Sequence, residues 1–99
     1  MIKAVIIDDK KQIRDSIRKK LTHYFKNEIE IIGEEESVKG GVKLIETLKP
    51  DLLFLDIELT DGYSFDILEQ IETFDFQMIF ITGFNHLAIK AIKLGAALV

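Results

Sequence analysis

The chain has 99 residues, of which 47% are hydrophobic and 30% are charged, and its formal net charge at pH 7 is -4. This length suits a single domain with one core, and the hydrophobic content excludes a disordered chain. The absence of cysteine excludes disulfides and thiolate metal sites and suits a cytoplasmic location, while the negative charge argues against a direct grip on nucleic-acid phosphates.

Strand-like and helix-like segments alternate in the first half of the chain. Strands are predicted at 2–7 and 28–32, the second with one wetter face, near an edge of the sheet. Between them, apolar residues recur at helical spacing over 11–25. The residues predicted to face the core from this helix are Ile13, Ile17, Leu21 and Tyr24.

The middle of the chain repeats the alternation. Ser37 is predicted to cap a second helix, and Pro50 is predicted to block its continuation before a strand at 51–55. The residues predicted to face inward from this helix are Val38, Val42, Ile45 and Leu48.

After a turn at Asp61-Gly62, a third helix is predicted to begin at Ser64. Its inward residues are predicted to be Phe65, Leu68 and Ile71. A strand at 77–81 and a helix at 85–94 follow, and residues 96–99 resemble the start of a fifth strand. Four consecutive strand–helix units predict an α/β fold with a parallel sheet covered by helices on both faces.

Three of the predicted strands end in residues suited to metal or phosphate chemistry. The first ends in Asp8-Asp9, the third in Asp56 and the fourth in the hydroxyl residue Thr82. The carboxyl ends of parallel strands share one edge of a sheet, where open α/β sheets bind ligands. Clustered carboxylates need a cation, and Mg²⁺ is the hard ion that such oxygens suit. The pattern therefore predicts a magnesium site beside one reactive aspartate.

Each of these residues also has a plain structural interpretation. Taken alone, Asp8-Asp9 would be a turn or a helix cap, Asp56 would be a common strand-end aspartate, and Thr82 would be a packed β-branched residue. The combination favours a site, in which Thr82 and the backbone N–H of Gly83 would donate to a phosphoryl group on a carboxylate.

These motifs resemble the receiver domain of bacterial two-component response regulators. The resemblance rests on Asp8-Asp9, on the stretch Phe54-Leu55-Asp56-Ile57-Glu58 and on Ile81-Thr82-Gly83, and it covers essentially the whole chain. The stretch Thr82-Gly83-Phe84, followed by Ala88-Ile89-Lys90-Ala91-Ile92, is most similar to receivers of the LytTR type (LytR/AlgR). The resemblance implies a flavodoxin-like, doubly wound sheet with strand order 2-1-3-4-5.

The resemblance also implies residue roles. Asp56 would accept the phosphoryl group, and Thr82 would be the switch hydroxyl. Asp9 would bind Mg²⁺ directly, Asp8 would orient the water shell of the ion, and the backbone carbonyl of Glu58 would be a further ligand. The chain would act as a phosphoacceptor rather than an enzyme, with at most self-phosphorylation and self-dephosphorylation.

The implied partners follow from the same family. A sensor histidine kinase would supply the phosphoryl group, and DNA would be contacted only through a LytTR-type transcriptional output domain after residue 99. The basic residues within helix 11–25 and directly before it would form a solvated face that also docks the histidine-phosphotransfer partner. These residues are Lys10, Lys11, Arg14, Arg18, Lys19 and Lys20. No contact with a membrane is expected.

The chain departs from the family pattern at three places. Lys10 stands where many relatives have a third acid, so we expect a less negative pocket and weaker metal binding. Thr60 stands where proline is usual, so we expect a looser loop. Strand five and helix five are expected to be incomplete or absent, because the 99 residues end early in strand five, and the strand-five lysine of the family therefore has no counterpart here. We expect such a truncated receiver to form a homodimer, or to be marginally stable as a monomer, because of its exposed strand edge.

Two other functions fit parts of the pattern. The first is a pseudo-receiver that signals through protein contacts without phosphate. The absence of the strand-five lysine favours it, whereas the intact acid pair Asp8-Asp9 argues against it. An aspartate-nucleophile phosphatase of the haloacid dehalogenase kind would suit Asp56-Ile57-Glu58-Leu59-Thr60, but Glu58 replaces the second aspartate of that motif.

Overall fold

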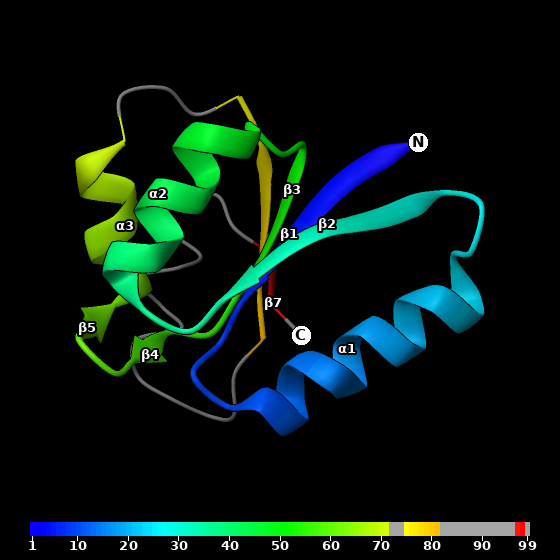
Figure 1. Cartoon of the computed structure of the whole chain (residues 1–99), viewed down its shortest axis with the longest axis horizontal. Coiled ribbons are helices and arrows are strands. Elements are labelled where there is room, and N and C mark those ends of the chain that lie inside the picture. Colours follow the sequence, from blue (N-terminus) through cyan, green and yellow to red (C-terminus); the bar gives the residue numbers. More distant parts are fainter. Residues whose placement is uncertain (72–74, 82–96, 99) are drawn as a thin grey trace.

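A computed structural model describes residues 1–71, 75–81 and 97–98 of the chain (Figure 1). The helix predicted at 85–94, together with Thr82 and Gly83, lies outside the described residues. No helix within the described ranges is both long and apolar enough to cross a membrane.

Five parallel strands form the central sheet, in the order β2-β1-β3-β6-β7. Apart from two short strands in a loop, these are the first to fifth strands along the chain, so the predicted order 2-1-3-4-5 is confirmed. Their bounds are β1 Ile2–Ile7, β2 Ile29–Glu35, β3 Leu52–Leu55, β6 Gln77–Phe80 and β7 Ala97–Leu98.

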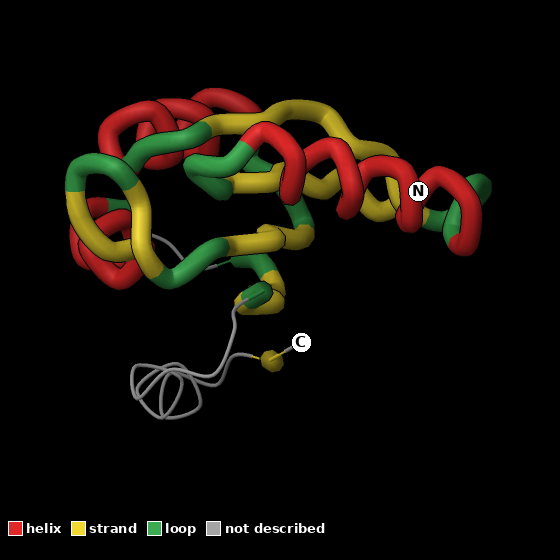
Figure 2. The backbone as a smooth tube through the Cα atoms, turned by 90° about the horizontal axis from the view of Figure 1, so that it is seen from below, coloured by secondary structure: helices red, strands yellow, loops and turns green. Residues whose placement is uncertain are grey.

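Three described helices cover the two faces of this sheet (Figures 1 and 2). Helix α1 (Lys11–Tyr24) lies on one face, and α2 (Val38–Leu48) and α3 (Ser64–Gln70) lie side by side on the other. Alternate residues of β1 and β3 serve the two faces, as the two-residue period of a strand requires. Ala4 and Ile6 pack with Ile17 and Leu21 of α1, whereas Val5 and Ile7 belong to the core beneath α2 and α3.

Several sequence predictions hold at the level of single residues. The Ser37 hydroxyl accepts a hydrogen bond from the Gly40 N–H (2.9 Å) and caps α2, as predicted. Phe65, Leu68 and Ile71 are buried, although Ile71 follows α3 rather than lying within it. Strand β2 lies at the edge of the sheet, as predicted, but continues to Glu35, three residues beyond the predicted end at 32.

Three residues predicted to face the core are instead exposed. The exposed fractions are 36% for Ile13, 71% for Tyr24 and 37% for Leu48. Tyr24 and Leu48 are the last residues of their helices, and Ile13 lies in the first turn of α1. Helical periodicity identifies the apolar stripe of a helix, but only the part of that stripe that lies over another layer becomes buried.

The loop between β3 and α3 contains two short strands that the sequence did not predict. Strands β4 (Glu58–Leu59) and β5 (Gly62–Tyr63) pair antiparallel across a turn at Thr60-Asp61, one residue before the predicted turn at Asp61-Gly62. Gly62 has φ +151°, and a Cβ there would lie 2.7 Å from Asp66 Oδ2, so this turn requires glycine. Thr60 therefore lies between two paired strands, and the expectation of a looser loop stays a prediction.

Candidate metal and phosphoryl site

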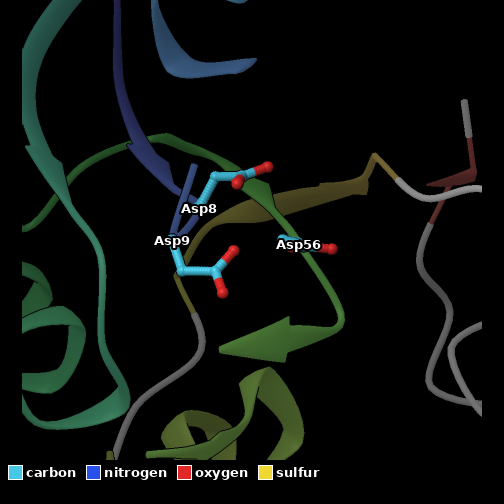
Figure 3. A group of neighbouring side chains, drawn as sticks. All are labelled: Asp8, Asp9 and Asp56. Atoms are coloured by element: carbon cyan, nitrogen blue, oxygen red, sulfur yellow. The ribbon is translucent and has the colours of Figure 1, made fainter. Parts of the chain in front are cut away.

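The sheet itself brings the acidic residues together. Ile7 and Leu55, the last residues of β1 and β3, are partners in the parallel ladder. Directly beyond them, the Asp56 N–H donates to the carbonyl of Ile7 (2.9 Å), and the Asp8 N–H donates to the carbonyl of Glu35 (3.0 Å). The backbone at the strand ends is therefore held on both sides of β1, and the side chains that follow project from one edge of the sheet (Figure 3).

Asp8, Asp9 and Asp56 form a compact acidic cluster. One carboxylate oxygen from each lies within 4.8 Å of those from the other two. Asp8 is buried, and Asp9 and Asp56 are half-buried. Oxygen ligands at this spacing, partly open to water, suit a hard divalent cation that keeps several of its waters. The prediction that these three residues gather at one edge is confirmed.

A lysine ammonium lies among these carboxylates. Lys10 Nζ is 3.0 Å from Asp9 Oδ1, 3.0 Å from Asp56 Oδ2 and 3.8 Å from Asp8 Oδ1. The hydrogen bond to Asp56 is the main cause that raises the pKa of Lys10 above its ordinary value, and the hydrogen bond to Asp9 is the next. From the sequence we expected Lys10 to make the pocket less negative and to weaken metal binding, but its contacts with all three carboxylates were not foreseen, because the direction of its side chain was not known.

The environment of Asp8 disfavours the ionised form of its carboxyl group. Burial is the main reason that the pKa of Asp8 rises above its ordinary value, and the negative charge of Asp56 adds to the rise. The Lys10 N–H donates to Asp8 Oδ1 (2.8 Å) and opposes this rise. Binding of a cation would therefore stabilise the ionised form of these three carboxylates.

An ion-pair network ties α1 to this edge of the sheet. Arg14 donates through Nη1 to the carbonyl of Asp8 (2.6 Å) and through Nε to Glu34 (3.1 Å), and Arg18 also pairs with Glu34. The side chain of Arg14 is only 14% exposed. The interpretation of Arg14 as part of a solvated basic face was therefore wrong, because Glu34 of the neighbouring strand supplies its partner.

Hydrogen bonds fix the loop after Asp56 at its base and at its turn. The Ser64 N–H donates to the carbonyl of Ile57 (2.9 Å), and Ser64 is fully buried. Asp61 accepts hydrogen bonds from the N–H groups of Val38 (2.6 Å) and Lys39 (3.1 Å) at the start of α2. Glu58 lies in β4, two residues after Asp56, with its side chain exposed. Sequence reasoning missed the Asp61 contacts, which join segments more than 20 residues apart.

Comparison with known proteins agrees with this geometry. The family model for the response regulator receiver domain matches residues 4–99. The response regulator domain of Thermotoga maritima CheB superposes with a TM-score of 0.86 at 19% identity, covering 100% of this chain and 77% of that one. At this identity the likeness shows the fold alone, and it confirms the predicted flavodoxin-like class.

Relatives of known name are more similar in sequence. The sensory transduction protein LytT of Bacillus anthracis is 31% identical over 98 residues, covering 97% of this chain and 39% of that protein. The transcriptional regulatory protein YdfI of Bacillus subtilis (strain 168) is 34% identical over 99 residues, covering 97% of this chain and 46% of that protein. The chain thus spans less than half the length of these two relatives, and the similarity to LytT agrees with the predicted LytTR resemblance. Because the family match includes all but the first three residues, the chain belongs to the response regulator receiver domains of two-component signalling.

Proposed function

We propose that this receiver domain accepts a phosphoryl group on Asp56, with Mg²⁺ bound by Asp8, Asp9, Asp56 and the backbone carbonyl of Glu58. The observation that carries the proposal is the convergence of three carboxylates from two adjacent strand ends, with ligand oxygens within 4.8 Å of one another. A sensor histidine kinase is the proposed donor, because the family serves two-component signalling.

The proposed transfer exchanges one bond to phosphorus for another. An Asp56 carboxylate oxygen forms a bond to phosphorus while the bond from phosphorus to the donor histidine nitrogen breaks, and the electron pair stays with the imidazole. When bound, Mg²⁺ neutralises the charge of the phosphoryl oxygens. The Thr82 hydroxyl and the Gly83 N–H are proposed to donate to the same oxygens. Water would later remove the phosphoryl group, so enzymatic activity is limited to self-phosphorylation and self-dephosphorylation.

The output is proposed to be transcriptional. The relative YdfI is named as a transcriptional regulatory protein, and the chain covers 46% of it. We propose that a LytTR-type DNA-binding domain follows this receiver in the full-length protein, and that phosphorylation shifts the receiver between two states with different affinities for that domain. DNA would then be contacted by the output domain alone.

Two measurements test the site. Mg²⁺ titration followed by NMR should first shift the amide signals of Asp8, Asp9 and Asp56, and Asp9→Ala should abolish these shifts. Acetyl phosphate with Mg²⁺ should add one phosphoryl mass to the wild type and none to Asp56→Asn. Asp75→Asn, an exposed residue just before β6, is the matched control and should accept phosphate normally.

The alternative functions predict different results. Metal binding without any mass increase would support a phosphorylation-independent pseudo-receiver. Steady turnover of a phosphate ester by the purified protein would support the phosphatase.

A further inference from the structure

The ammonium of Lys10 lies where a bound cation would be expected. It forms hydrogen bonds to Asp9 Oδ1 and Asp56 Oδ2, both at 3.0 Å, and lies 3.8 Å from Asp8 Oδ1. These contacts reach all three members of the cluster, which come from two different strands. A single positive charge, covalently attached to the end of β1, thus partly compensates three negative charges.

The backbone of Lys10 is anchored, whereas its side chain is accessible. The Lys10 N–H donates to Asp8 Oδ1 (2.8 Å), and the Lys10 carbonyl accepts from the N–H groups of Ile13 and Arg14 in the first turn of α1. The side chain is 61% exposed. The ammonium can therefore leave the cluster by rotation about side-chain bonds, without any movement of the strand or the helix.

We propose that Lys10 is a tethered competitor of Mg²⁺, which holds the carboxylates together in the metal-free protein and must leave before the ion can bind. This inference rests on the proposed metal site and adds to it a residue that sets its affinity. Lys10 is thus a specificity-determining residue, and it is not itself a ligand.

The two cations cannot use the cluster together. Mg²⁺ binds oxygens at about 2.0–2.1 Å in a nearly octahedral shell that includes water. A carboxylate oxygen that donates its lone pairs to the ion, and the waters around it, would crowd an ammonium 3.0 Å away, and the two positive charges would repel each other. A charged lysine has no lone pair to offer a metal, so its displacement is the way to relieve the conflict.

Displacement would link metal binding to the reactivity of Asp56. In the metal-free state, Asp56 Oδ2 accepts a hydrogen bond from Lys10 Nζ (3.0 Å), and this hydrogen bond must break before that oxygen can attack phosphorus. Loading Mg²⁺ frees this oxygen from Lys10. The competition would therefore keep Asp56 less reactive until the metal is present.

The test compares Lys10→Met with Lys11→Met. Both variants lose one positive charge at neighbouring positions, but Lys11 is 76% exposed and pairs with Asp15 on α1, away from the cluster. By isothermal titration calorimetry, Lys10→Met should bind Mg²⁺ about tenfold more tightly than the wild type. Lys11→Met should change the affinity less than about twofold, because only long-range, screened electrostatics act there.

A second measurement separates competition from general stabilisation. Without metal, Lys10→Met should unfold at lower urea concentration than the wild type, because its three carboxylates lose their counter-charge. At saturating Mg²⁺ this difference should vanish, since the lysine no longer contacts the cluster. In the wild type, the ¹³Cε signal of Lys10 should shift with the same midpoint as the Asp9 amide, while that of Lys11 stays in place.

The possible failures are distinguishable. If the wild type binds Mg²⁺ and Lys10→Met binds it with unchanged or lower affinity, Lys10 is not a competitor, and the proposed function stands. If neither protein binds Mg²⁺, the metal site and the inference both fail. Lys10→Gln keeps a polar side chain and repeats the test if Lys10→Met does not fold.

Discussion

At the scale of the residue, Asp8 is a buried carboxylate of the acidic cluster, and burial disfavours its ionised form. Asp8 as a whole is only 3% exposed, and burial together with the charge of Asp56 raises the pKa of its carboxyl group. Such a group favours the folded state when it is protonated and opposes it when it is ionised. Residues of this kind are candidates for substitutions that increase stability and abolish function.

We predict that Asp8→Asn stabilises the metal-free protein at neutral pH by roughly 1 kcal/mol, the scale typical of removing functional strain. Because the pKa of Asp8 is raised in the folded state, its contribution to stability is complete below its unfolded pKa of about 4 and is lost as the pH rises through the folded pKa. The gain of Asp8→Asn should therefore be present at about pH 7 and shrink toward about pH 4. Urea unfolding with a metal chelator at both pH values checks this.

Asp15→Asn is the control for this prediction, because Asp15 is exposed on α1 and pairs only with Lys11 among the contacts described. It removes the same charge and should change the free energy of unfolding by no more than about 0.5 kcal/mol. Equal effects of the two substitutions would mean that net charge, rather than burial of Asp8, controls stability.

At the scale of the element, the loop after Asp56 and the start of α2 depend on each other. Two N–H groups of α2 have their hydrogen-bond acceptor in Asp61 rather than in their own helix, while Ser37 serves a third. An unpaired N–H group at the start of a helix raises the free energy of the folded state. Because Asp61 accepts from two such groups, its loop and the start of α2 stabilise each other. The loop that carries Glu58 is thereby fixed against α2.

Asp61→Ala should therefore speed hydrogen exchange at the Val38 and Lys39 amides and lower the urea midpoint of the protein. The hydrogen bond from the Val38 N–H is the main cause that lowers the pKa of Asp61. Its stabilising contribution is thus present above the unfolded pKa of about 4 and is lost as the pH falls through the lowered pKa. Ser37→Ala, the comparison variant, should expose the Gly40 amide and leave Asp61 bound. Unchanged exchange at Val38 in Asp61→Ala would contradict the coupling.

At the scale of the whole molecule, the sheet separates two cores, and among the described residues the two differ in size. The core under α2 and α3 contains the fully buried Phe80, whose ring lies 5.6 Å from that of Phe65. The core under α1 is smaller and is built around Ala4, Ile6, Ile17 and Leu21 with Leu52 and Phe54. Strand β6 links the larger core to the carboxyl edge, since Phe80 is followed by Ile81, whose N–H donates to the carbonyl of Leu55 (2.8 Å).

Phe80→Ala should destabilise the whole domain by about 3–5 kcal/mol, the range for deleting a buried phenyl ring. The loss should appear in the unfolding of the complete domain, followed by circular dichroism, because Phe80 belongs to the core beneath α2 and α3. Gln77→Ala, an exposed position on the same strand, is the control and should change stability by no more than about 0.5 kcal/mol. A large loss of helical signal in the Gln77 variant would show that the strand, rather than the core, limits stability.

Local sequence was sufficient to predict the strands of the central sheet, the three described helices and the identity of the acidic cluster, but not the short strands β4 and β5. Apolar runs define buried strands, Ser37 and Pro50 define the limits of α2, and parallel strands necessarily bring Asp8, Asp9 and Asp56 to one edge. The resemblance to receivers supplied the strand order, which periodicity cannot provide. The roles of Asp56, Thr82 and Glu58 remain predictions.

Only the tertiary structure decided which parts of each helix are buried and where long side chains point. Tyr24 and Leu48 continue an apolar stripe but lie at helix ends, where no layer formed by the described residues covers them. Lys10 and Asp61 find partners distant in sequence, at Asp56 and at the start of α2. The direction of a flexible side chain depends on charges that folding brings near, so the cation inside the acidic cluster became visible only in three dimensions.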